Sequence, residues 1–175
     1  MGGLVYWRPR PSPTLAGTDV IVLADFENST GDTLFDGTLR QGLSVGLEQS
    51  PFLRVLPAWR VEDTLKLMGK PADTPVARQV ALEVCQRTGS RAVISGSITP
   101  LIDRYILTLE ATDCPSGDPL VQVRTEARGK VEVLGALDRA AIDIRHKLGE
   151  LRATLQKYDT PLAEATTPLA RGTQS

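Results

Sequence analysis

Three runs of β-branched and aromatic residues lie in the middle of this chain: GSRAVISGSIT at 89–99, RYILTLEATD at 104–113 and LVQVRTEAR at 120–128. Two turn-forming stretches separate them, at 100–103 and 115–119. Strand-like runs joined by such turns predict an antiparallel meander. In the second and third runs, apolar and polar side chains alternate, as in a sheet with one buried and one solvated face.

Helical patterns flank this meander, which indicates an α/β domain and not a helical bundle. The fold class that we expect is therefore α/β, with a mixed β-sheet packed by helices and a long C-terminal helix. Strands are predicted at 20–24 and 52–57, and helices at 37–49, 60–68, from Thr74 to Gly89, and 130–158. In the first helix, one apolar stripe recurs every four residues, formed by Phe35, Leu39, Leu43 and Leu47.

The last predicted helix carries an apolar seam that steps by three and four residues over three heptads. Its members are Leu134, Leu137, Ala141, Ile144, Leu148, Leu151 and Leu155. One interpretation places the whole seam on the domain core. In the other interpretation, the helix extends beyond the sheet, and Leu148, Leu151 and Leu155 form a face for a partner helix.

Charge and motifs limit the function classes. The net charge of -1 gives no electrostatic basis for binding nucleic acid. The sequence contains no phosphate-binding loop, dinucleotide fingerprint, kinase signature or hydrolase elbow. One histidine and two cysteines do not form a usual metal motif. We therefore predict no catalytic residue, no cofactor and no metal site.

The stretch 25–36 is the one cluster that suggests binding. It follows a strand, where open α/β sheets place ligands, and its candidate residues are Asp25, Glu27, Asn28, Asp32 and Asp36. The simpler interpretation is a solvated loop in which Asp32 or Asp36 caps the next helix. An alternative is an atypical metal-dependent enzyme with this acidic loop as its site.

Other features leave two interpretations each. Cys85 and Cys114 are either unrelated thiols or a disulfide, which needs an oxidising compartment. The apolar segment Leu4–Trp7 is either the remnant of a membrane span or part of a disordered N-terminus or an added strand. We divide the chain into a linker or span remnant at 1–17, a domain at 18–158 and a disordered linker at 159–175.

The order of these elements resembles the TolB amino-terminal-like domain, which is related in plan to CsgG- and FlgO-type domains. The resemblance covers residues 18–158. It is carried by Ala-Asp-Phe at 24–26, PFLRVLP at 51–57, RTGSRAVISGSI at 87–98 and DCPSGD at 113–118. Within that group, the sequence is most similar to the domain between the membrane span and the tetratricopeptide repeats of bacterial transmembrane serine/threonine kinases.

The resemblance implies a non-catalytic, extracytoplasmic domain, a fragment of a membrane protein, that binds a protein or a small ligand. It favours the disulfide between Cys85 and Cys114 and the span remnant at Leu4–Trp7. It also makes 158–168 the connector into the repeats. A homo-oligomer formed through sheet edges or the apolar seam is the further alternative. Members of the group share no active site, so no catalytic residue is transferred.

Overall fold

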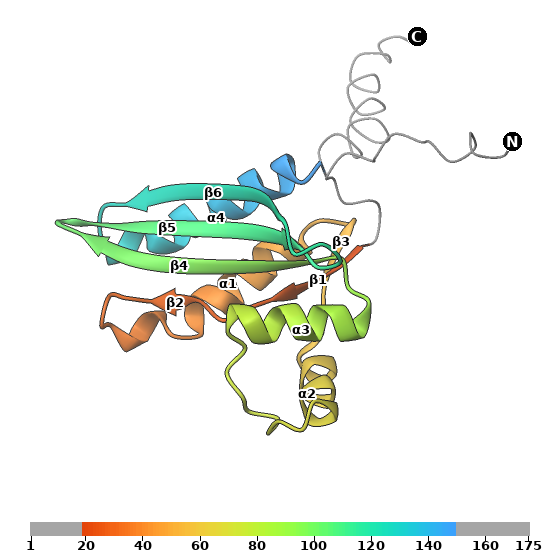
Figure 1. The fold of residues 1–175 in the computed structure, drawn as a ribbon. Coiled ribbons are helices and arrows are strands. Elements are labelled where there is room, and N and C mark those ends of the chain that lie inside the picture. The colour runs from red at the N-terminus through yellow and green to blue at the C-terminus, as the bar shows by residue number, and fades with distance from the viewer. Residues whose placement is uncertain (1–18, 150–175) are drawn as a thin grey trace, which may run out of the picture.

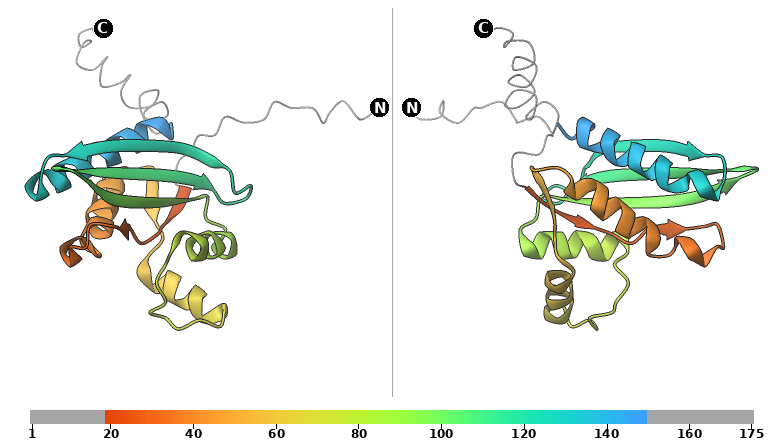
Figure 2. Two further views of the ribbon diagram at one scale, coloured as in Figure 1. Left: turned by 60° about the vertical axis from the view of Figure 1, so that its left-hand side comes forward. Right: turned by 180° about the vertical axis from the view of Figure 1, so that it is seen from behind.

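The computed structural model describes residues 19–149 as a six-stranded mixed sheet between two layers of helices (Figures 1 and 2). The sheet order is β3-β1-β4-β5-β6, and β2 pairs with β4 beside this path. The strands are β1 (Asp19–Leu23), β2 (Glu27–Asn28), β3 (Leu53–Val55), β4 (Ala92–Leu101), β5 (Arg104–Asp113) and β6 (Pro119–Ala127). The helices are the 3₁₀ turn η2 (Thr33–Phe35), α1 (Thr38–Glu48), α2 (Ala58–Leu67), α3 (Arg78–Thr88) and α4 (Lys130–Lys147). The expected fold class is confirmed.

The sheet combines a parallel half with an antiparallel half. β1 is parallel to both β3 and β4, while β4, β5 and β6 form the antiparallel meander that the sequence predicts. α1 and α4 cover one face of the sheet, and α3 with α2 covers part of the other. β1 is buried on both sides because Ile21 and Leu23 face the first layer while Val22 faces the second. This explains its continuous apolar run.

The larger core lies between the sheet and the pair α1–α4. The predicted apolar stripe of α1 is confirmed, since Phe35, Leu39, Leu43 and Leu47 are all buried there. Gly46 brings the two helices close together, because a Cβ atom at this position would lie 3.2 Å from Cβ of Ala141.

The helix predicted over 130–158 is not continuous. α4 ends at Lys147, and Gly149 follows with φ +93°, a left-handed conformation that ends helices readily. Leu148 is fully buried in the larger core, so it does not offer a free face to a partner helix. Leu134 is 51% exposed, whereas its neighbour Val133 is buried, so the buried face differs from the predicted seam. Leu151 and Leu155 lie outside the described residues.

Two further differences concern the stretch that precedes the meander. α3 begins at Arg78 and not at Thr74, because the backbone of Val76 bonds with Asp25 in both directions instead of entering the helix. The expected loop after β1 contains the short strand β2, paired with Ser97 and Ile98 of β4. A strand of two residues has too few positions to show alternation in a sequence.

A disulfide joins Cys85 of α3 to Cys114 at the end of β5. Both cysteines are buried in the smaller core, with Val22, Val84 and Val93 among its members. The structure therefore contains the disulfide, and the interpretation of Cys85 and Cys114 as unrelated thiols is wrong. No helix within residues 19–149 is both long and apolar enough to span a bilayer.

Candidate functional site

A polar groove of about 200 Å³ lies where β1 ends, on the face of the sheet that α3 only partly covers. The connection from β1 to β2 and the first turn of α3 form its walls, and the meander forms its floor. The lining residues are Asp25, Glu27, Arg78, Ser95, Gly96, Ser97, Thr108, Glu110 and Gln122. Of the predicted binding residues, only Asp25 and Glu27 reach this groove.

Asp25 holds two segments together at the rim of the groove. Its backbone N–H donates to the carbonyl of Val76 at 2.8 Å, and the N–H of Val76 donates back to Oδ2 of Asp25 at 2.8 Å. Oδ1 of Asp25 lies 3.4 Å from Nε of Arg40, whose guanidinium also donates to the carbonyl of Leu23 at 3.1 Å. One oxygen of this carboxylate thus accepts from the loop before α3, and the other pairs with Arg40 of α1.

Arg78 and Glu110 join the wall of the groove to its floor. Nη2 of Arg78 lies 2.9 Å from Oε1 of Glu110 and donates to Oγ1 of Thr112 at 3.2 Å. The groove otherwise presents the hydroxyls of Ser95, Ser97 and Thr108. Hydroxyls both donate and accept, so this lining suits a polar ligand or the backbone of a peptide.

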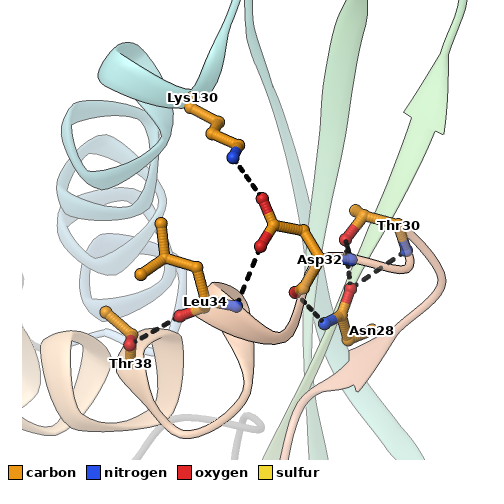
Figure 3. A network of polar contacts seen from close by, with 6 residues as sticks. All are labelled: Asn28, Thr30, Asp32, Leu34, Thr38 and Lys130. Atoms are coloured by element: carbon orange, nitrogen blue, oxygen red, sulfur yellow. Dashed lines mark hydrogen bonds and ion pairs between the residues drawn. The ribbon is translucent and has the colours of Figure 1, made fainter.

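The remaining candidate residues, Asn28, Asp32 and Asp36, form a separate network. Figure 3 shows the part of it around Asn28 and Asp32. Nδ2 of Asn28 donates to the carbonyl of Asp32 at 2.9 Å and to Oδ1 of Asp36 at 2.8 Å, while its Oδ1 accepts from the N–H of Thr30 at 3.0 Å. The amide side chain of Asn28 therefore connects residues 30, 32 and 36 of the same loop by hydrogen bonds. Asn28, Asp32 and Asp36 do not line the groove.

Asp32 connects this loop to the start of α4. Its Oδ1 accepts from the N–H of Leu34 at 2.9 Å, which caps η2, and its Oδ2 forms an ion pair with Nζ of Lys130. The hydrogen bond from Lys130 is the main cause that lowers the pKa of Asp32, and the same bond raises the pKa of Lys130. The capping role predicted for an aspartate here is thus filled by Asp32, though on η2 rather than on α1.

The acidic side chains of the loop do not converge on one point. Within residues 19–149, no group of three or more histidine, cysteine, aspartate or glutamate side chains is placed to hold a metal ion. Asp25 contacts Arg40 and Val76, whereas Asp32 contacts Lys130 and Leu34. The arrangement gives this loop a structural role, and it places only Asp25 and Glu27 beside the groove.

The sequence interpretation did not identify the polar residues of the groove floor. Ser95, Ser97, Thr108 and Gln122 come from three strands, and each is an ordinary solvent-facing residue in its own strand. Their alternation with apolar neighbours shows that they share a face. What places them beside Asp25 is the parallel pairing of β1 with β4, which the sequence does not specify.

The fold, but no sequence family, connects the chain with known proteins. No family model matches the sequence, and no curated protein is similar enough in sequence to count as a relative. The C-terminal domain of LpoB from Salmonella enterica has the same fold, with a TM-score of 0.60 at 12% identity, over 67% of this chain and 87% of that one. Lipoprotein GNA1162 from Neisseria meningitidis gives a TM-score of 0.54 at 21% identity, over 71% and 94%.

A PelC dodecamer from Paraburkholderia phytofirmans, solved as a single-residue variant, is similar over 79% of this chain and 95% of its own, with a TM-score of 0.51 at 14% identity. TolB from Acinetobacter baumannii reaches a TM-score of 0.48, too low for an argument about the fold. The chain thus has the fold that LpoB, GNA1162 and PelC share. The resemblance to a kinase-associated domain remains a proposal.

Proposed function

We propose that this chain is a non-catalytic, extracytoplasmic domain of a bacterial membrane-associated protein, and that it binds a protein partner or a small polar ligand. The observation that carries the proposal is the buried disulfide between Cys85 and Cys114. Structural disulfides persist in oxidising compartments and are rare in the cytosol. The similarity in fold to a lipoprotein, GNA1162, supports the same location.

The compartment can be tested in the native host. Cells are quenched in acid, the protein is denatured, and free thiols are labelled with a maleimide of known mass. An extracytoplasmic domain should carry no label on the peptides that contain Cys85 and Cys114 until a reductant is added. Label on both peptides before reduction would contradict the proposed location.

The groove is the proposed binding surface. It combines hydroxyls with the carboxylate of Glu27 and the ion pair of Arg78 and Glu110, and these groups suit a peptide or an amine-bearing ligand. A photo-crosslinking amino acid at Ser97 should give a discrete adduct in the native host. The matched control at the exposed Glu62 of α2 should give none. Adducts of equal yield at both positions would contradict the proposal that the groove is the binding surface.

The proposed context is a transmembrane serine/threonine kinase in which this domain lies between the membrane span and tetratricopeptide repeats. Support for it comes from the sequence resemblance alone. The test is the reading frame that surrounds the gene. A kinase coding region upstream and repeats downstream are expected, and a flanking sequence with neither would contradict this context.

Self-association is the second candidate function. PelC, which has the same fold, is described as a dodecamer, and we propose that this chain also forms homo-oligomers. Sedimentation at two protein concentrations tests this, with a mass that rises with concentration as the expected outcome. A single monomer mass at both concentrations would contradict it.

A further inference from the structure

The turn between β4 and β5 exposes an apolar side chain in a strained backbone conformation. Ile102 is 98% exposed and has φ +55°, the one positive φ of a residue other than glycine within the described chain. In a two-residue hairpin turn, glycine, asparagine or aspartate normally takes this conformation. A β-branched residue is a genuine outlier there, and strain of this kind concentrates at functional positions.

A shallow depression of about 410 Å³ lies directly beside this turn, on the face of the meander that α3 leaves open. Its lining residues are Thr99, Pro100, Leu101, Ile106, Thr108, Gln122 and Arg124. Ile106 is buried at its base but belongs to neither of the two cores. With Leu101, it forms an apolar centre on an otherwise polar face of the sheet.

The turn lies at the far end of the sheet from the start of β1 and the end of α4 (Figure 1). β1 pairs with the first residues of β4, from Ala92, whereas the turn follows the last residue of that strand, Leu101. α3 packs near the beginning of β4, where its Cys85 is bonded to Cys114. The turn therefore lies away from α3, while the depression extends along the meander as far as Thr108 and Gln122, which also line the groove.

We propose that the β4–β5 turn is a self-association surface, in which Ile102 of each copy inserts into the depression of a second copy. The projecting side chain and the depression lie on the same hairpin, so one two-fold axis can form both contacts at once. The charges are also complementary. Asp103 beside Ile102 is 79% exposed and pairs through Oδ1 with Nε of Arg104 at 3.5 Å, which leaves its Oδ2 for the exposed Arg124 that borders the depression of a second copy. A second copy of this chain supplies both the apolar side chain that enters the depression and the charge that pairs with Arg124.

This inference rests on the second candidate function, self-association, and adds the surface that performs it. The patch is small compared with stable interfaces, which bury about 1,200–2,000 Å². A weak dimer in rapid exchange is therefore expected. The protein should change from monomer to dimer in sedimentation velocity as its concentration rises from about 10 µM to about 1 mM.

Ile102→Gly should raise the dissociation constant at least about tenfold, as loss of a central apolar side chain does at interfaces. Glycine suits the positive φ, so this variant folds at least as well as the wild type, and the loss cannot be attributed to unfolding. The matched control is Leu67→Ser, which removes an 81% exposed side chain of α2, a helix that lies far from the turn (Figure 1). It should leave the dissociation constant unchanged.

A charge exchange tests the second contact. Asp103→Arg and Arg124→Asp should each weaken the dimer, and the double variant should restore it. If the wild type associates but these variants behave like it, the tip is not the surface, although self-association stands. If the wild type remains a monomer up to about 1 mM, both proposals fail. A monomer that instead co-sediments with phosphatidylglycerol vesicles through Ile102 would also overturn the inference.

Discussion

At the scale of single residues, Ile102 adopts a positive φ, a backbone conformation that isoleucine disfavours. The turn conformation costs a residue with a Cβ atom roughly 1–2 kcal/mol, and the side chain regains nothing by packing because it is exposed. A residue that violates a local rule without internal compensation is expected at functional or strained sites. The inferred contact with a second copy supplies such a reason.

The monomer should therefore become more stable when Ile102 is replaced by glycine. We expect Ile102→Gly to raise the free energy of unfolding by up to about 1 kcal/mol, since relief of the strain exceeds the entropic cost of glycine. Urea unfolding at low protein concentration measures this change. Ile102→Asn should give a smaller gain. A loss of stability in both variants would show that the turn is not strained.

Asp32 is the second residue with a defined effect, because it links the loop after β2 to α4. Its pKa is lower in the folded protein than in the unfolded chain, chiefly through the hydrogen bond from Lys130. The stabilisation is therefore fully present above the unfolded-state pKa of about 3.9 and is lost as the pH falls through the lower folded-state pKa.

Asp32→Asn keeps a side-chain oxygen for the N–H of Leu34 but removes the charge that Lys130 binds. We expect this variant to be slightly less stable than the wild type at pH 7, and the difference should shrink as the pH falls below about 4. Chemical unfolding at a series of pH values measures both limits. A difference that is constant with pH would show that the ion pair does not contribute.

At the scale of secondary-structure elements, β4 pairs with more strands than any other strand of the described sheet. It pairs with β1, β2 and β5, and so it joins the parallel half of the sheet to the meander. The ring of Phe26, in the connection from β1 to β2, packs over Gly96 of this strand. A Cβ atom at Gly96 would lie 2.6 Å from two atoms of that ring and 3.0 Å from Cδ2 of Leu109. Close approach of another segment is a usual reason for glycine inside a strand.

Gly96→Ala should consequently displace Phe26 and lower the free energy of unfolding by about 1–3 kcal/mol, as overpacking does. Thermal and urea unfolding measure this loss. Gly129→Ser is the matched control and should not be destabilising, because a Cβ atom there would have no neighbour within 4 Å and serine is favoured at the N-cap position that Gly129 occupies in α4. In the double variant with Phe26→Leu, the cost of Gly96→Ala should be smaller. Simple additivity of the two changes would contradict the contact.

At the scale of the whole molecule, the disulfide joins α3 to the end of the meander strand β5 within the smaller core. Cys85 lies on α3 and Cys114 at the end of β5, 29 residues apart in sequence. Closing a loop of this length restricts the unfolded chain and typically stabilises a fold by about 2–4 kcal/mol. The bond therefore keeps α3 against the meander, and α3 forms one wall of the groove.

Replacing both cysteines by alanine should lower the free energy of unfolding by about 3 kcal/mol. The measurement is urea unfolding of the wild type with and without a reductant, beside the double variant. Reductant should destabilise the wild type and leave the variant unchanged. A wild type that is insensitive to complete reduction would show that the cross-link does not contribute to stability.

The parts of the structure that depend on local pattern could be predicted. The alternation in β5 and β6 and the four-residue stripe of α1 identified the meander and the buried helix face, because each follows the period of its own element. The length of α4 could not be predicted in this way. Its seam continues in the sequence beyond Gly149, where the backbone turns.

The candidate site could be predicted only in part. Asp25 and Glu27 follow β1 directly, so their place near the end of that strand was accessible from the sequence, and they do line the groove. Asn28, Asp32 and Asp36 are as polar and as near in sequence, yet hydrogen bonds turn them toward one another and toward Lys130. Which polar groups of a loop face a groove is decided by contacts between distant segments.

The sequence by itself determined which segments become strands and helices and which of their faces are apolar, because hydrophobic spacing acts over neighbouring residues. Only the tertiary structure decided that β4 lies between β1 and β5 and that Cys85 meets Cys114. It also decided that Ile102 projects from the far end of the sheet. These relations depend on pairing between segments far apart in the chain, and no local spacing encodes that pairing.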